Sequence, residues 1–271
     1  MRVLIACDME GISGVTHWEH VDPKHPEYQR FRAIMTDEVN AAIDGALDAG
    51  ATAITVTDGH NNGRNVLIEK LRSPAHLNSG SPAPLSMVEG VQHSDLVFFI
   101  GYHAMAGTPD AILCHTWTDQ VRGVWLNDRA VGEIGLNAAV CGSFNVPIGL
   151  VTGDVAATQE AIDLLGPIAI GPIETVAVKR AVSRMAAECY PVEENQRAIR
   201  AAAARAVRAS RVPWRVESPL TLVVELSRPD QIDRALRTPA SMRLGGTRIQ
   251  WQGHDMREVY RAFRAIVGLG E

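Results

Sequence analysis

Two carboxylates follow an apolar run near the N-terminus, in the stretch VLIACDMEGISG. The run at 3–7 is typical of a buried strand, and Asp8 and Glu10 come directly after it. Because the two acids are two positions apart, an extended backbone directs both side chains the same way. A buried strand has no need of such charges, so the pair predicts a functional site at its end.

Further acidic and imidazole side chains follow other apolar runs. Asp58 and His60 come after the run at 53–57, and three more candidates are His103 after 96–101, His115 after 111–114 and Glu133 at the start of a helical pattern. In open parallel sheets, ligands bind outside the carboxyl ends of the strands, where residues distant in sequence meet. We expect the other histidines to serve surface or packing roles: His17, His20, His25, His76, His93 and His254.

Carboxylates crowded together repel one another and take up protons unless a cation is bound. Histidine with carboxylate suits zinc, and also manganese or cobalt, while the lack of nearby cysteine ligands disfavours a structural zinc site. With Asp8, Glu10 and Glu133 as anionic ligands and His60 and His103 neutral, two divalent ions and one hydroxide balance the charge. This predicts a two-ion site in which Asp8, closest to the strand, is the shared ligand.

Two such ions lie about 3.5–4 Å apart and activate a bridging hydroxide for attack on a carbonyl or phosphoryl group. His115, with an ordinary pKa of roughly 6.5, is the candidate for proton transfer or for donation to the oxyanion. Asp58 and Asn61 flank His60 and are candidates for orienting its ring, with a turn role as the alternative for Asp58. The residues leave several functions open: a peptidase, a hydrolase of phosphoesters, lactones or other amides, and a non-catalytic dipeptide-binding or metal-binding assembly.

Alternating strand and helix patterns predict an α/β fold: a three-layer α/β/α arrangement with a largely parallel, mixed sheet. The expected strands are 3–7, 53–57, 96–101, 111–114, 146–152 and 175–178. We expect a helix from Thr36, capped by its hydroxyl, to about residue 48, and another ending near Gly142. After about residue 190 the composition changes, which predicts a catalytic domain at 1–190 and a smaller α+β unit at 191–271, with the boundary between 190 and 215.

Composition limits the partners. The 271 residues are 46% hydrophobic and 21% charged, with a net charge of -5, which is ordinary for a globular protein and argues against nucleic acid as a partner. No apolar run approaches the roughly 20 residues of a membrane span, so we expect no membrane partner. The apolar run at 3–7 is also too short for the core of a signal peptide, so we expect a cytoplasmic location. The four cysteines are scattered, which predicts reduced thiols, with Cys7 in the core.

Several blocks together resemble one known family. The blocks are CDMEGISG, TDGHNNGRN, PLSMVEG, FIGYHAMAGTP, HTW, NDRAVGEIGLNA and VAVKRAVSRMAAECYP. In this order they are similar to the zinc-dependent D-aminopeptidase family of bacterial dipeptide-transport operons, with the resemblance running from residue 1 to about 192. CD stands here where the family has VD.

The resemblance implies a self-compartmentalising zinc peptidase that assembles as a ring-shaped homodecamer. It implies two zinc ions per chain, held by Asp8 as the bridge with Glu10, His60, His103 and Glu133, and a catalytic role for His115. The implied activity is removal of an N-terminal residue from short peptides, and the preference for D-residues rests on the resemblance alone.

Three charged residues in the resembling blocks have open roles. Glu89 in PLSMVEG is a candidate for holding a positive group, with an ordinary loop as the alternative. Lys179 and Arg184 either attract a substrate carboxylate or form structural or intersubunit pairs.

Overall fold

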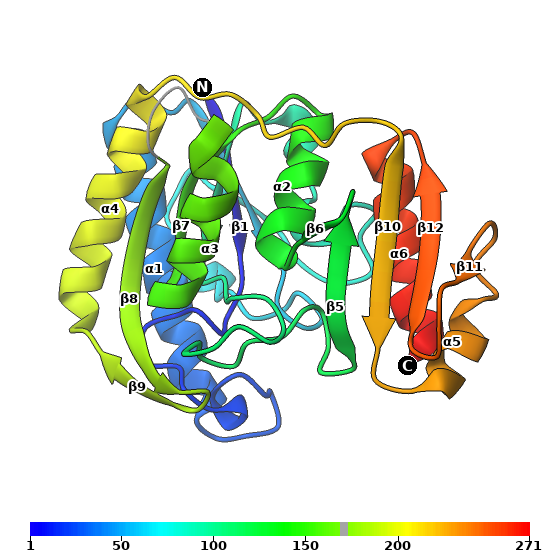
Figure 1. The fold of residues 1–271 in the computed structure, drawn as a ribbon. Helices are drawn as coiled ribbons and strands as arrows, with labels where there is room; N and C mark the ends of the chain where they lie inside the picture. The colour runs from blue at the N-terminus through cyan, green and yellow to red at the C-terminus, as the bar shows by residue number, and fades with distance from the viewer. Residues whose placement is uncertain (169–172) are drawn as a thin grey trace.

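The computed structural model describes residues 1–168 and 173–271. Its larger sheet has the strand order β3-β2-β1-β4-β7-β8-β9, and all neighbours pair parallel except β8 and β9. Figure 1 labels β1, β7, β8 and β9 of this sheet. The strands are β1 (Arg2–Cys7), β2 (Ala53–Asp58), β3 (His76–Asn78), β4 (Leu96–Ile100), β7 (Ile148–Asp154), β8 (Glu174–Ser183) and β9 (Ala186–Cys189). The prediction of a mixed, mostly parallel sheet is confirmed.

Helices cover both faces of this sheet. The helices α1 (Tyr28–Asp48) and α4 (Val192–Arg208) pack together on one face, and α2 (Glu133–Ser143) and α3 (Val155–Leu165) lie on the other. The buried side chains of β1 alternate between the two resulting cores, because successive side chains of a strand point to opposite faces. The predicted three-layer α/β/α arrangement is therefore confirmed.

A second, antiparallel sheet has the order β11-β12-β10-β5-β6. Its strands are β5 (Val121–Leu126), β6 (Arg129–Ala130), β10 (Leu220–Leu226), β11 (Met242–Arg243) and β12 (Arg248–Gly253). The helix α6 (Met256–Gly270) packs on β10, β12 and α2, and α5 (Pro229–Ala235) packs on α6. The chain thus carries its C-terminal helix back toward α2, which begins at Glu133.

The division into 1–190 and 191–271 stays a prediction. The helix α4 lies on the first sheet, whereas β5 and β6, from the middle of the chain, pair within the second sheet. Short 3-10 helices complete the element list: η1 (Trp18–His20), η2 (Ile68–Lys70), η3 (Ser86–Val88), η4 (Val91–His93) and η5 (Gly166–Ile168).

Two local predictions were wrong. Residues 111–114 form a loop, because the Ile112 N–H donates to Asp154 Oδ2 (2.6 Å) and the Leu113 N–H to the Arg184 carbonyl (2.9 Å) instead of to a strand. The helix expected from Thr36 begins at Tyr28. Thr36 is buried inside it, and its hydroxyl donates to the Arg32 carbonyl rather than capping the start.

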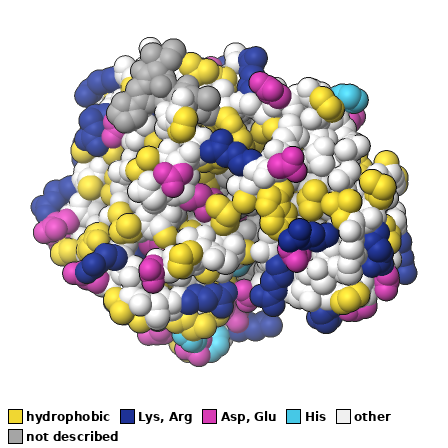
Figure 2. Space-filling view, viewed as in Figure 1, with side chains coloured by type: hydrophobic (Ala, Val, Ile, Leu, Met, Phe, Trp, Pro, Cys, Tyr) yellow, Lys and Arg dark blue, Asp and Glu magenta, His cyan; other side chains and the backbone are white. Residues whose placement is uncertain are grey.

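The surface carries mixed charge. On the face shown in Figure 2, Lys and Arg side chains lie interspersed with Asp and Glu side chains. Among the described residues, no helix combines the length and apolar character needed to cross a membrane.

Candidate metal centre

Adjacent parallel strands bring three of the candidate loops together. Cys7, the last residue of β1, is paired with Asp58 of β2 and with Ile100 of β4, so the chain after each strand leaves the same edge. The loops are also bonded directly, because the Gly11 N–H donates to the Gly101 carbonyl at 2.8 Å. A Cβ at Gly11 would lie 2.0 Å from a backbone oxygen, so this approach requires glycine.

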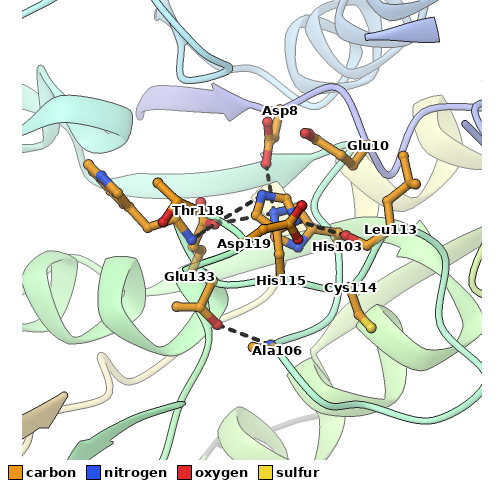
Figure 3. A network of polar contacts seen from close by, with 12 residues as sticks. Asp8, Glu10, His103, Ala106, Leu113, Cys114, His115, Thr118, Asp119 and Glu133 are labelled. Atoms are coloured by element: carbon orange, nitrogen blue, oxygen red, sulfur yellow. Dashed lines mark hydrogen bonds and ion pairs between the residues drawn. The ribbon is translucent and has the colours of Figure 1, made fainter. Parts of the chain in front are cut away.

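The candidate side chains form a continuous buried chain of acids and imidazoles. His60 Nδ1 lies 3.2 Å from Asp8 Oδ1 and 3.1 Å from Glu10 Oε2. His103 Nε2 lies 3.4 Å from Asp8 Oδ2 and 3.3 Å from Glu133 Oε1. The two oxygens of Asp8 therefore face two different imidazoles, and Figure 3 shows Asp8, Glu10, His103 and Glu133 converging.

Backbone carbonyls fix how each imidazole is turned. His60 Nε2 lies 3.0 Å from the Val21 carbonyl, and His103 Nδ1 lies 3.1 Å from the Ala104 carbonyl. Because a carbonyl only accepts, these nitrogens carry the proton in the neutral rings. The other nitrogen of each ring then directs its lone pair at the carboxylates, an arrangement that is repulsive unless a cation lies between them.

Electrostatics within the cluster support the same conclusion. Burial and the neighbouring Glu10 raise the pKa of Asp8 from 3.8 to about 7. Burial lowers the pKa of His60 and of His103. The nearby carboxylates, Glu10 beside His60 and Glu133 beside His103, outweigh this effect, and both pKa values are raised well above 6.5. Without a metal, the carboxylates would thus draw protons onto the imidazoles.

Two buried atoms of the cluster lack a hydrogen-bond partner among the described residues: Glu10 Oε2 and His103 Nε2. Leaving a buried polar atom unsatisfied costs about 1–3 kcal/mol, more for a charged group, so such atoms call for an explanation. Suitable ligand atoms of Asp8, Glu10 and His103 lie within 4.8 Å of one another. The donor set of carboxylates and imidazoles fits zinc.

His115 lies at the edge of this set. Its ring stacks on His103 with centroids 3.9 Å apart, and its Nε2 lies 4.0 Å from Glu133 Oε1. Its Nδ1 lies 2.8 Å from the Leu113 carbonyl, which leaves Nε2 unprotonated in the neutral ring. Burial, followed by the nearby His103, lowers its pKa below 6.5. The ligand atoms of His103, His115 and Glu133 also fall within 4.8 Å of one another, so proximity alone does not separate a ligand from a proton carrier.

Surrounding groups hold the loops rather than the rings. The carboxylate of Asp58 accepts from the N–H groups of Asn65 and Val66, and the Asn65 amide donates to the His60 carbonyl. Asp58 therefore fixes the turn that carries His60, which is the turn role considered as the alternative from sequence, and the Val21 carbonyl orients the imidazole.

The other charged candidates form hydrogen bonds and ion pairs within the protein. Lys179 is fully buried and donates to three backbone carbonyls, those of Glu10, Ile12 and Val15. Arg184 pairs with Asp119 at 2.8 Å and also donates to the Cys114 carbonyl. Glu89 accepts from the Leu85 N–H and stabilises the turn at η3.

A cavity of about 680 Å³ opens over the cluster. Trp18, Met87 and Trp117 contribute its larger apolar walls, and Arg264 of α6 reaches it from the far end of the chain. Sequence reasoning missed Arg264, because it lies on an ordinary amphipathic helix more than a hundred residues beyond Glu133.

Comparison with known proteins identifies the family. Residues 1–265 match the model of the D-aminopeptidase family of peptidases. The chain belongs to this family. It is 36% identical to the D-aminopeptidase of Bacillus subtilis strain 168, with 99% of this chain and 97% of the relative covered.

A solved structure of the family is closely similar. It is described as the zinc-dependent D-aminopeptidase DppA from Bacillus subtilis, a self-compartmentalizing protease, and matches with a TM-score of 0.95 at 36% identity. The match covers 100% of this chain and 98% of that one. The family expected from the sequence blocks is therefore confirmed, and the chain is a peptidase of the D-aminopeptidase family.

Proposed function

We propose that this protein removes N-terminal residues, D-residues among them, from short peptides at a centre of two zinc ions. The observation that carries the proposal is the arrangement of His60 and His103. Each ring is anchored to a backbone carbonyl through one nitrogen and turns its other nitrogen toward buried carboxylates at 3.1–3.4 Å.

The ligands fall into two groups that share one residue. Asp8 Oδ1, Glu10 and His60 make up one group, and Asp8 Oδ2, His103 and Glu133 make up the other. Three carboxylates facing two divalent ions leave one positive charge, which a hydroxide neutralises. When bound, the ions would polarise the scissile carbonyl and lower the pKa of a water molecule toward neutrality.

His115 is the group proposed to move protons. Its lowered pKa keeps the ring neutral near pH 7, and its Nε2 has a free lone pair because Nδ1–H is held by the Leu113 carbonyl. A neutral imidazole in this position accepts a proton and delivers it to the departing amine. Trp18 packs edge-on against the ring at 5.3 Å and limits its rotation.

Assembly and location form part of the proposal. The similar solved structure is described as a self-compartmentalizing protease, which supports a homo-oligomer here, and we take a ring-shaped decamer as the working size. A cytoplasmic location is supported by the four unpaired cysteines, two of which are buried.

The test is turnover by the zinc-loaded protein on matched pairs of D- and L-aminoacyl amides and dipeptides, together with metal analysis of protein never exposed to chelator. We expect hydrolysis of D-substrates, its loss with a chelator, and two zinc ions per chain. No hydrolysis of any substrate would refute the peptidase assignment, and a single ion per chain would refute the two-ion centre.

A further inference from the structure

The cavity over the metal centre contains a single Lys or Arg side chain among the described residues that line it. This is Arg264, from α6. Besides the imidazoles of His60 and His115, the other ionisable side chains lining the cavity are acidic: Asp8, Glu10, Asp22, Asp119, Glu133 and Glu271. A lone guanidinium in an otherwise acidic cavity calls for a specific explanation.

Arg264 is held in place by backbone carbonyls rather than by an acid. Its Nη1 donates to the Ala83 carbonyl at 2.8 Å and to the Pro84 carbonyl at 3.0 Å. Both protons of Nη1 are thus used, and the guanidinium is fixed against the loop between Ser81 and Ser86, which also lines the cavity. These two contacts set the position and the plane of the group before any ligand arrives.

The other edge of the guanidinium is open. In the part of the chain that the structure describes, Nε and Nη2 of Arg264 form no hydrogen bond, and the side chain has no acid within 4.0 Å. The Nε–Nη2 edge is the one that binds a carboxylate through two parallel hydrogen bonds. A half-buried Arg with this edge free is therefore suited to an external carboxylate.

We propose that Arg264 binds the C-terminal carboxylate of a short peptide substrate. The proposal rests on the aminopeptidase function proposed above. An aminopeptidase cleaves the bond next to the free amine, so the amine end of the peptide lies at the metal centre and its carboxylate end is left for Arg264, which lines the same cavity. Lys179 and Arg184, considered from sequence for this role, are committed to the contacts described above.

A fixed carboxylate subsite has a consequence for peptide length. Backbone contacts fix the positions of both the metal centre and Arg264. Only peptides whose two ends reach from the metal centre to Arg264 therefore bind at both places. Arg264 thus favours a particular short length and disfavours substrates whose carboxylate is blocked.

The experiment compares a D-alanyl dipeptide bearing a free carboxylate with the same dipeptide as its C-terminal amide, both cleaved by zinc-loaded protein. In the wild type we expect kcat/KM to be about 10- to 100-fold higher for the free acid, the range expected for a charge-assisted hydrogen bond. In Arg264→Gln, which keeps a polar side chain but loses the charge and the paired Nε–Nη2 edge, this acid-to-amide ratio falls toward one, chiefly through the KM of the acid.

Arg261→Gln is the matched control, since Arg261 lies one turn away on the same helix, is exposed and does not line the cavity. It retains the wild-type ratio. A wild type that does not distinguish the two substrates, or an Arg264→Gln variant that keeps the wild-type preference, overturns the carboxylate subsite while leaving the peptidase function standing. Wild type that cleaves neither substrate overturns the peptidase function itself, and the subsite with it.

Discussion

Lys179 Nζ donates to the backbone carbonyl of Glu10 at 2.7 Å, although the two residues are 169 positions apart. The same ammonium donates to the carbonyls of Ile12 and Val15, so all three of its protons are used. Lys179 comes from β8 and holds the loop that follows β1. The position of one predicted metal ligand therefore depends on a strand from a different part of the sheet.

Replacing Lys179 tests this dependence. We expect Lys179→Met to lower the free energy of unfolding by about 2–4 kcal/mol, because three buried carbonyls lose their donor, and to reduce the zinc content. Denaturant unfolding and metal analysis measure the two effects. Lys70→Met is the control, since Lys70 is exposed. Wild-type stability and zinc content in Lys179→Met would show that the loop after β1 keeps its position without Lys179.

His115 and His60 are expected to respond differently to the same substitution. We expect His115→Ala to retain zinc and to lose about 10²- to 10⁴-fold in kcat, the usual contribution of a group that moves a proton. His60→Ala should lose both zinc and activity, because Nδ1 of His60 faces Asp8 and Glu10 directly. Metal analysis with steady-state kinetics separates the two outcomes.

The surface histidine His93 supplies the reference variant His93→Ala, which we expect to behave as wild type. Loss of zinc from His115→Ala would instead make His115 a ligand. Its ligand atom is close enough to those of His103 and Glu133 for that result to be informative.

Glu38 predicts a pH dependence of stability. It is fully buried, one carboxylate oxygen accepts from the Ser13 N–H, and burial raises its pKa from 4.5 to about 7. Between these values the folded protein keeps a proton that the unfolded chain has released. The contribution of Glu38 to stability is thus fully present below about pH 4.5 and is lost as the pH rises to 7.

We expect Glu38→Gln to remove this dependence. The free energy of unfolding of the wild type should fall relative to that of the variant by on the order of 3 kcal/mol between pH 4.5 and pH 7. Urea titrations at a series of pH values measure the free energy of unfolding of both proteins. The contributions of the other titrating groups cancel in the difference between the two. Parallel curves for the two proteins would mean that Glu38 ionises normally in the folded state.

The strand ends could be predicted from sequence because the carboxyl end of a buried parallel strand is recognisable from a short apolar run. Asp8, His60 and His103 follow such runs, and strand pairing brings them together. His115 lies beside His103, as expected, but the strand predicted before it at 111–114 is a loop. The loop before it has no ladder partners and is held by Asp154, which the local sequence does not reveal.

Residues contributed by the second sheet and its helix were harder to anticipate. Arg264 reaches the cavity because α6 packs against α2, and the helix pattern gives only which face is apolar, not which element covers it. Lys179 was recognised as notable, but its three carbonyl partners follow from the path of the loop after Glu10. Long-range contacts of this kind require the assembled fold.

Glu160 offers a further test of how the centre is positioned. Its Oε2 accepts from the Met105 N–H at 2.8 Å, two residues after His103, and a Cβ placed on Gly132, next to Glu133, would lie 2.9 Å from its Oε1. It therefore lies between the two loops that carry these ligands.

We expect Glu160→Leu to weaken zinc binding about 10- to 100-fold, the usual cost of losing a group that orients a ligand. Glu160→Gln, which keeps an acceptor oxygen for Met105, should restore most of that affinity. Competition with a chelator of known affinity measures both variants, and equal weakening in the two would mean that charge rather than the Met105 contact supports the site.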